Sequence, residues 1–230
     1  MLRLVVVLAL LAMPAGAERV DLGARTIEED GVVVAFPAVA YEAPDGSGPP
    51  AVVAARAASA ALGAAVDPDR DLVAVTPHRV VLKDPTDAGR ILKVYRADRH
   101  DAGRVARYLQ RDLGLETFLR DLGLRLATID RAPRLLERGV IRQERVAGRP
   151  LDLFYPRGYP AGADPAVDRV LATIARVDVP LRGIVARQSG LFLANTADCV
   201  HEVPVGVDVG HCLGNLFRER ATRDVVLIDW

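Results

Sequence analysis

Three short runs rich in β-branched and other apolar residues follow one another between residues 71 and 95. They cover residues 72–75, 79–82 and 90–95, and turns containing Pro77, Pro85 and Gly89 separate them. Runs of this length between such turns are typical of an antiparallel meander. The next segment, residues 101–122, instead spaces its apolar residues as on one face of a helix. These patterns together constrain the chain to the α+β class.

The pattern after this helix extends the same sheet. Residues 124–129, 133–136 and 140–146 contain two more predicted strands, which gives a five-stranded antiparallel sheet. Gly114 is expected to split the preceding helix, because a glycine inside a helix costs about 1 kcal/mol relative to alanine. A further helix is predicted at residues 165–177.

The C-terminal residues predict a β-hairpin made of residues 216–218 and 224–228. If this hairpin is symmetric about Thr222, Asn215 faces Asp229 directly across the two strands. Directly opposed residues have Cβ atoms about 4.5 to 5.5 Å apart. An amide oxygen and a carboxylate placed in this way can share one Mg²⁺ ion, which prefers oxygen ligands. The spacing therefore predicts a metal-binding hairpin.

The first seventeen residues have the pattern of a secretory signal peptide. Arg3 precedes an apolar run at residues 4–13, and Ala15, Gly16 and Ala17 supply the small residues of a cleavage site. The run is about half the length of roughly twenty residues that a membrane-spanning helix needs. The sequence thus predicts export to the periplasm or beyond, with the mature chain beginning at Glu18.

Residues 18–70 are predicted to form an N-terminal extension. It contains one strand at residues 31–38, a loop rich in Gly and Pro, and an Ala-rich helix at residues 51–65. We find no residues with evident chemistry here. Its apolar face is expected to pack on the segment that follows.

The charge composition excludes one class of partner. The chain has 30 basic and 30 acidic residues and 5% aromatic residues, so it lacks the basic, aromatic surface of a nucleic-acid-binding protein. No segment after the signal peptide is apolar enough to predict a membrane span. The basic residues are almost all arginine, so the two lysines, Lys83 and Lys93, stand out. A compact ammonium can bind phosphate oxygens as a point charge.

The order of these elements resembles the protein-kinase fold. Residues 91–95 resemble the third-strand segment with its Lys, residues 116–122 resemble the αC helix with its Glu, and residues 141–151 resemble the hinge. Residues 214–217 and 225–230 are similar to the metal-binding segments of aminoglycoside-type kinases. Within the superfamily, the chain is most similar to the small YrbL-like proteins of the PhoP regulatory network. That likeness rests on His78-Arg79, Pro85, Asp87-Ala88, Arg90, Lys93 and Tyr95 and on the early end of the chain.

The resemblance covers residues 71–230 and implies two parts, a kinase-like N-lobe at 71–151 and a truncated helical C-lobe at 152–230 that ends in the metal-site hairpin. It implies ATP and Mg²⁺ as cofactors. The resemblance implies that Lys93 binds the ATP phosphates and that Glu116 pairs with Lys93. It also implies that His78 and Arg79 donate to phosphate from a turn and that Glu144 and Val146 bind adenine through their backbone. Asn215 and Asp229 would bind Mg²⁺, and Asp208 would be the catalytic base.

The sequence departs from the kinase pattern at two places. Residues 73–80 contain no glycine, so the glycine-rich loop over the phosphates is missing. Kinases place the base five residues before the metal-binding Asn, and Gly210 occupies that position here, whereas Asp208 lies seven before Asn215. Either a two-residue insertion keeps Asp208 in reach of the acceptor hydroxyl, or the base is absent. The function is then an ATP- and Mg²⁺-dependent phosphotransferase with an unknown, potentially protein, acceptor, or a pseudokinase that binds a protein partner.

Plainer interpretations stand beside these roles. Lys93 could be an exposed strand lysine, Glu116 a solvated helix carboxylate and Asp229 a carboxylate near the chain end. Two cysteines and two histidines could suggest zinc, but their spacing fits no common zinc finger or ribbon. In an oxidising compartment a disulfide between the two cysteines is the stronger expectation, and it would contribute about 3 kcal/mol. The residues concerned are Cys199, His201, His211 and Cys212.

Overall fold

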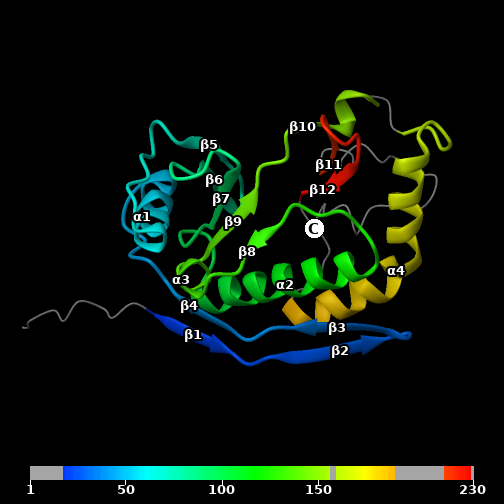
Figure 1. The fold of residues 1–230 in the computed structure, drawn as a ribbon. Coiled ribbons are helices and arrows are strands. Elements are labelled where there is room, and N and C mark those ends of the chain that lie inside the picture. Colours follow the sequence, from blue (N-terminus) through cyan, green and yellow to red (C-terminus); the bar gives the residue numbers. More distant parts are fainter. Residues whose placement is uncertain (1–17, 156–158, 190–214, 229–230) are drawn as a thin grey trace, which may run out of the picture.

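A five-stranded antiparallel sheet organises the first half of the fold. The structure is a computed structural model that describes residues 18–155, 159–189 and 215–228. It confirms the predicted α+β class (Figure 1). The strands follow the order β5-β6-β7-β9-β8, and all neighbours are antiparallel. Their bounds are β5 Leu72–Val75, β6 Arg79–Lys83, β7 Arg90–Tyr95, β8 Ile129–Asp130 and β9 Val140–Glu144.

Helix α1 (Pro50–Leu62) covers one face of this sheet. The face consists of alternating residues of β6 and β7, among them Leu82, Leu92 and Val94, which are at most 2% exposed. The buried stripe of α1 is nearly all alanine, so the helix can approach the sheet closely. The extension thus packs on the sheet through its Ala-rich helix, as the sequence predicted.

Helix α2 (Ala102–Asp121) lies against the opposite face. Its N-terminus is capped by Asp101, whose carboxylate accepts a hydrogen bond from the N–H of Arg104 at 2.7 Å. Leu109 and Leu113 of α2 pack with Tyr95 and Ile141 of the sheet in a second buried cluster. Alternation along β7 therefore directs Leu92 and Val94 toward α1, and Lys93 and Tyr95 toward α2.

The N-terminal residues form a long interrupted hairpin along α2 (Figure 1). Strand β1 pairs with β4, and β2 pairs with β3. The two ladders are separated near Gly23 and Pro37, and the Gln110 amide of α2 donates to the carbonyls of both residues, at 2.9 and 2.8 Å. The sequence predicted one strand here, so three of four were missed. The bounds are β1 Arg19–Leu22, β2 Arg25–Glu29, β3 Val32–Phe36 and β4 Val39–Glu42.

The prediction that Gly114 splits the helix is wrong, because α2 is continuous from Ala102 to Asp121. Gly114 instead allows β3 to approach the helix. A Cβ atom at this position would lie 2.5 Å from Cδ1 of Phe36 and 3.0 Å from the carbonyl oxygen of Ala35. Both distances are shorter than van der Waals contact. The glycine at this position is thus explained by its packing against β3 and not by local helix propensity.

Replacement of Gly114 by Ala is therefore expected to destabilise the protein by about 1 to 3 kcal/mol through overpacking. This sign is opposite to the gain of about 1 kcal/mol that helix propensity alone predicts. Gly103→Ala is the matched control in the same helix, because a Cβ there meets only flexible side chains, at 3.3 Å or more. Urea unfolding measures both variants. If Gly114→Ala is as stable as Gly103→Ala, the close approach of β3 to α2 does not restrict the size of the side chain at position 114.

The remaining elements lie around the C-terminal hairpin, apart from one short helix that packs against α1, β9 and β4. Helix α4 (Pro165–Ser189) continues through Pro180, so its predicted end at residue 177 is wrong. Leu181, Ile184 and Val185 beyond the proline are fully buried, and their burial outweighs the roughly 3 kcal/mol cost of an interior proline. The other elements are α3 Pro133–Leu136, β10 Gly148–Pro150, the 3-10 helix Leu151–Leu153, β11 Leu216–Glu219 and β12 Val225–Leu227.

Several predictions fall outside the described residues. They concern the signal peptide at residues 1–17, the cysteine pair and histidines of residues 199–212, and the two aspartates Asp208 and Asp229. In the part of the chain that the structure describes, no helix is long and apolar enough to cross a membrane.

Candidate functional site

Two polar side chains from adjacent strands converge on one carbonyl at the end of the C-terminal hairpin. Lys93 of β7 is 6% exposed, and its Nζ donates a hydrogen bond to the carbonyl oxygen of Ile228 at 2.9 Å. Gln143 of β9 is 2% exposed, and its Nε2 donates to the same oxygen at 3.0 Å. Ile228 immediately precedes Asp229 in the chain. The sheet and the hairpin are therefore joined by the bond of Lys93 to the residue that precedes Asp229 in the chain.

The burial of Lys93 decides between two interpretations of this residue. An exposed strand lysine was the plainer one, and it is wrong, because the side chain is enclosed between the sheet and the hairpin. A buried ammonium requires polar partners to offset the loss of hydration. It also acts in a lower dielectric than water, which strengthens its attraction for an anion. Lys93 is thus suited to bind a phosphate oxygen.

Gln143 adds an unused acceptor to the same place. Its Oε1 is buried and has no hydrogen-bond partner among the described residues. A buried amide oxygen without a partner costs about 1 to 3 kcal/mol, which a ligand donor or a water molecule can recover. The sequence analysis included Gln143 only as part of the hinge segment. Gln143 lies two residues after Ile141, which pairs with Lys93 between β9 and β7, so all three side chains are on the same face of the sheet. This spacing was the signal that could have identified Gln143.

The C-terminal hairpin has a different register from the predicted one. Leu216 faces Leu227 and Phe217 faces Val226, so the turn is shifted by one residue. The N–H of Ile228 donates to the carbonyl of Asn215 at 2.9 Å, which makes Ile228 the cross-strand partner of Asn215. The assumed symmetry about Thr222 is therefore wrong, and Asp229 itself lies outside the described residues. A one-residue shift reverses the face of every side chain on one strand.

Strand β12 is also attached to the segment that precedes β8. The N–H of Leu227 donates to the Arg125 carbonyl at 2.9 Å, and the N–H of Ala127 donates to the Leu227 carbonyl at 3.0 Å. The sequence placed a strand of the main sheet at residues 124–129, but only its last residue joins that sheet. The rest of the segment fixes the hairpin beside Lys93 and Gln143.

The two predicted hinge residues, Glu144 and Val146, differ in their hydrogen bonds. The carboxylate of Glu144 accepts bonds from both guanidinium nitrogens of Arg125, at 2.7 and 3.1 Å, and from the N–H of Thr128 at 3.1 Å. Val146, two residues further on, is half-buried. Among residues 18–155, 159–189 and 215–228, no acceptor meets the N–H of Val146. The role of this N–H toward adenine stays a prediction.

Glu144 makes stability depend on acid pH. Its bidentate bond to Arg125, aided by Thr128, lowers the pKa of the carboxyl from 4.5 to about 2. A pKa that is depressed in the folded state stabilises the protein above the unfolded value, and this stabilisation is lost as the pH falls through the folded value. We expect Glu144→Gln to lower the unfolding free energy by about 2 to 3 kcal/mol at pH 7. The difference from wild type should shrink between pH 4.5 and about 2. Urea unfolding at pH 7, 4 and 2.5 measures it, and a constant difference would contradict the pairing.

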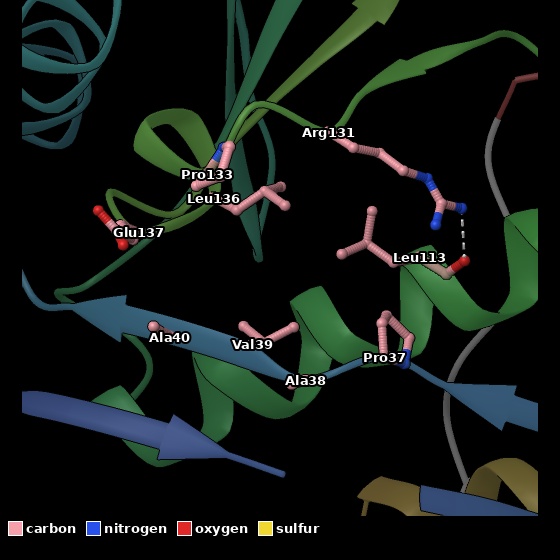
Figure 2. A pocket seen from close by; sticks show the side chains of 9 residues that line it. All are labelled: Pro37, Ala38, Val39, Ala40, Leu113, Arg131, Pro133, Leu136 and Glu137. Atoms are coloured by element: carbon pink, nitrogen blue, oxygen red, sulfur yellow. Dashed lines mark hydrogen bonds between the residues drawn. The ribbon is translucent and has the colours of Figure 1, made fainter. Parts of the chain in front are cut away.

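The structure gives Glu116 arginine partners in place of Lys93. The side chain is buried, and its two oxygens form ion pairs with Arg120 at 2.7 Å and with Arg131 at 2.6 Å. Arg131 also donates to the Leu113 carbonyl at 3.0 Å (Figure 2). The expected pair between Lys93 and Glu116 is therefore absent from the described residues. The plainer interpretation of Glu116 as a solvated carboxylate is wrong too.

The carboxylate of α2 that bridges to the sheet is Asp112, one turn before Glu116. It is 3% exposed and accepts bonds from Arg79 at 2.7 Å and from the hydroxyl of Tyr95 at 2.5 Å. Arg111 contacts its other oxygen at 2.8 Å. Burial raises the pKa of Tyr95 well above its usual value. Sequence analysis missed Asp112, because one acidic residue on an apolar helix face gives no indication of its partner.

The two turn residues predicted to hold phosphate are separated by this network. Arg79 points inward to Asp112 and Tyr95. His78 is exposed, stacks on His100 with ring centroids 5.1 Å apart, and lies 3.1 Å from it between ring nitrogens. Burial, followed by the charge of His78, lowers the pKa of His100. Of the pair, His78 alone is at the surface of the turn.

Asn215, a predicted metal ligand, is half-buried and directly precedes β11, and Asp229 and Asp208 lie outside the described residues. No three His, Cys, Asp or Glu side chains gather as metal ligands within residues 18–155, 159–189 and 215–228.

Comparison of the chain with protein-family models and with curated proteins gives no match. The geometry around Lys93 and Gln143 is therefore the evidence from which a function has to be argued.

Proposed function

We propose that the chain is a kinase-like nucleotide-binding protein whose cleft lies between the five-stranded sheet and the C-terminal hairpin. The observation that carries the proposal is the convergence of Lys93 and Gln143 on the carbonyl of Ile228. It joins a buried ammonium to the residue that precedes Asp229. The order of three strands, a helix and two strands, with helix α4 and the hairpin further along the chain, is compatible with the kinase resemblance.

Each described residue has a definite task in this proposal. The ammonium of Lys93 binds phosphate oxygens and neutralises part of their charge. The N–H of Val146 donates to the edge of the base, and Oε1 of Gln143 accepts from it or from a bridging water. On the resemblance alone, without support from the hairpin register, Asn215 and Asp229 would hold Mg²⁺, and bound Mg-ATP would supply the phosphoryl group. Asp208 would receive the proton of the acceptor hydroxyl.

A non-catalytic version of the same function is the second candidate. One observation favours it: Glu116 pairs with Arg120 and Arg131, so this carboxylate does not orient Lys93 as the αC Glu does in active kinases. In this case the cleft binds nucleotide without phosphoryl transfer, and the chain acts as a regulatory or protein-binding module. Export of the chain, proposed from residues 1–17, is compatible with either candidate.

Thermal unfolding of the chain beginning at Glu18, with increasing ATP and MgCl₂, tests the shared part of the proposal. A ligand at one hundred times its Kd stabilises the folded state by about 2.7 kcal/mol. We expect a saturable rise in Tm that requires both components. Absence of any shift at millimolar Mg-ATP would contradict nucleotide binding. Asp208→Asn then separates the two candidates, because it should retain the shift and abolish only phosphoryl transfer.

A further inference from the structure

A cavity of about 250 Å³ opens between the N-terminal hairpin and α3, outside the proposed nucleotide site (Figure 2). The chain from Pro37 into strand β4 forms one wall. Pro133 and Leu136 form the opposite wall, and Leu113 of α2 lies between the two walls. Arg131 and Glu137 mark its two ends. The cavity is mainly apolar, with one cation and one anion at its ends.

The edge of β4 that faces this cavity has unused hydrogen-bonding groups. In an antiparallel pair, alternate residues direct both N–H and C=O to the partner strand. The N–H of Ala43 donates to the Glu18 carbonyl at 2.8 Å, so Ala43, Tyr41 and Val39 are directed to β1. Ala40 and Glu42 are therefore directed outward. An outward edge of this kind can pair with another extended chain.

Part of this outer edge is already occupied. The N–H of Glu42 donates to the carbonyl of Glu137, at the end of α3, at 2.7 Å. The next outward position is Ala40, which lines the cavity and makes no such bond in the described part of the chain. The pairing that α3 begins at Glu42 is thus left open at Ala40. The available groups require an extended backbone as their partner.

The charges at the two ends of the cavity differ in availability. The guanidinium of Arg131 is engaged by Glu116, and it also donates to Thr117 at 2.7 Å. The carboxylate of Glu137 has no ion pair among the described residues, while the neighbouring Arg138 pairs with Glu42 at 3.2 Å. The end at Glu137 therefore favours a cationic group.

We propose that this cavity binds an extended peptide of a partner protein, which adds as a strand to β4 at Ala40. One branched apolar side chain of the peptide enters the cavity between Leu113 and Leu136. A Lys or Arg of the peptide lies beside Glu137. Main-chain bonds supply affinity in this mode of recognition, and the side-chain pocket and the charge supply specificity.

Selection of phage-displayed random heptapeptides on the chain beginning at Glu18 tests the proposal. We expect enriched peptides to combine β-branched residues with Lys or Arg. Fluorescence polarisation then measures how tightly the labelled peptides bind to variants of the chain. Ala40→Pro removes the outward N–H without breaking the β1–β4 ladder, and Glu137→Lys reverses the charge. Each should weaken binding at least tenfold, whereas Asp121→Lys, an exposed change at the far end of α2, should not.

A second readout is independent of these variants. In the amide spectrum of the wild-type chain, peptide addition should slow hydrogen exchange at Ala40 and leave the already bonded Tyr41 unchanged. This readout and Glu137→Lys decide the matter if Ala40→Pro fails to fold. The proposal is overturned if no peptide is enriched, or if enriched peptides bind the variants as tightly as wild type. Lys93→Met should leave peptide binding intact, so the outcome is separable from that of the nucleotide site.

Discussion

We expect Lys93→Met to abolish the Mg-ATP-dependent rise in Tm and Lys83→Met to leave it unchanged. The chain contains only these two lysines, so the pair forms a matched experiment. Lys93 is buried beside Ile228, whereas Lys83 is exposed and lies 3.4 Å from the Arg70 carbonyl. A hydrogen bond to a charged group contributes about 1.5 to 3 kcal/mol, so loss of the ammonium should weaken nucleotide binding by roughly 10- to 100-fold.

Lys93→Arg refines this result. A guanidinium keeps the charge but is planar and wide, so it cannot replace a compact ammonium in a closed space. We expect Lys93→Arg to bind Mg-ATP more weakly than wild type while unfolding with a similar midpoint in the absence of nucleotide. If Lys93→Met retains the shift of wild type, Lys93 does not contact the nucleotide and the assignment of β7 to a phosphate-binding strand is wrong.

Asp112→Asn is the substitution expected to lower stability most. It removes the carboxylate that Arg79, Arg111 and Tyr95 contact, and the side chains of Arg79 and Arg111 are only 11% and 8% exposed. Loss of one partner from a buried ion pair typically costs about 3 to 5 kcal/mol, because a buried charge is left without compensation. Asp112 also joins α2 to β6 and β7, so its loss should loosen the helix from the sheet.

The control for this prediction is Asp21→Asn. Asp21 pairs with Arg19 at the surface, where the two side chains are 66% and 53% exposed. Exposed pairs contribute about 0 to 1 kcal/mol, so this variant should unfold near the wild-type midpoint. Denaturant unfolding at pH 7 compares the two. Equal and small effects would mean that the network around Asp112 does not join α2 to the sheet.

The main sheet could be predicted from the sequence because its strands are short apolar runs that turns separate clearly. The runs at β5, β6, β7 and β9 are rich in apolar residues, and the alternation along β7 places Lys93 on the face toward α2. The hairpin along α2 gives no such signal. Strands β1 and β2 carry Arg, Asp and Glu at alternate positions and have no fully buried residue. Their stability comes from α2 and the Gln110 bonds, which no local pattern contains.

The pairs formed by the predicted site residues could not be derived from the sequence. Lys93 and Glu116 are both buried, as their roles require, but Glu116 bonds to Arg131, a residue fifteen positions away whose approach depends on the packing of β8 and α3. The register of β11 and β12 depends on the conformation of the turn, and a shift of one residue changed the partner of Asn215. Such pairings are tertiary properties that spacing alone does not determine.

Acylation of the chain by an acyl-phosphate derivative of ATP, mapped by mass spectrometry, tests nucleotide binding at this cleft most directly. The reagent transfers its acyl group to a lysine amine that lies beside the bound phosphates, and the chain offers only Lys83 and Lys93. We predict that Lys93 is labelled, that Lys83 is not, and that excess Mg-ATP suppresses the label on Lys93. Labelling of Lys83 in preference to Lys93, or labelling of Lys93 that Mg-ATP does not suppress, would contradict a nucleotide site between the sheet and the C-terminal hairpin.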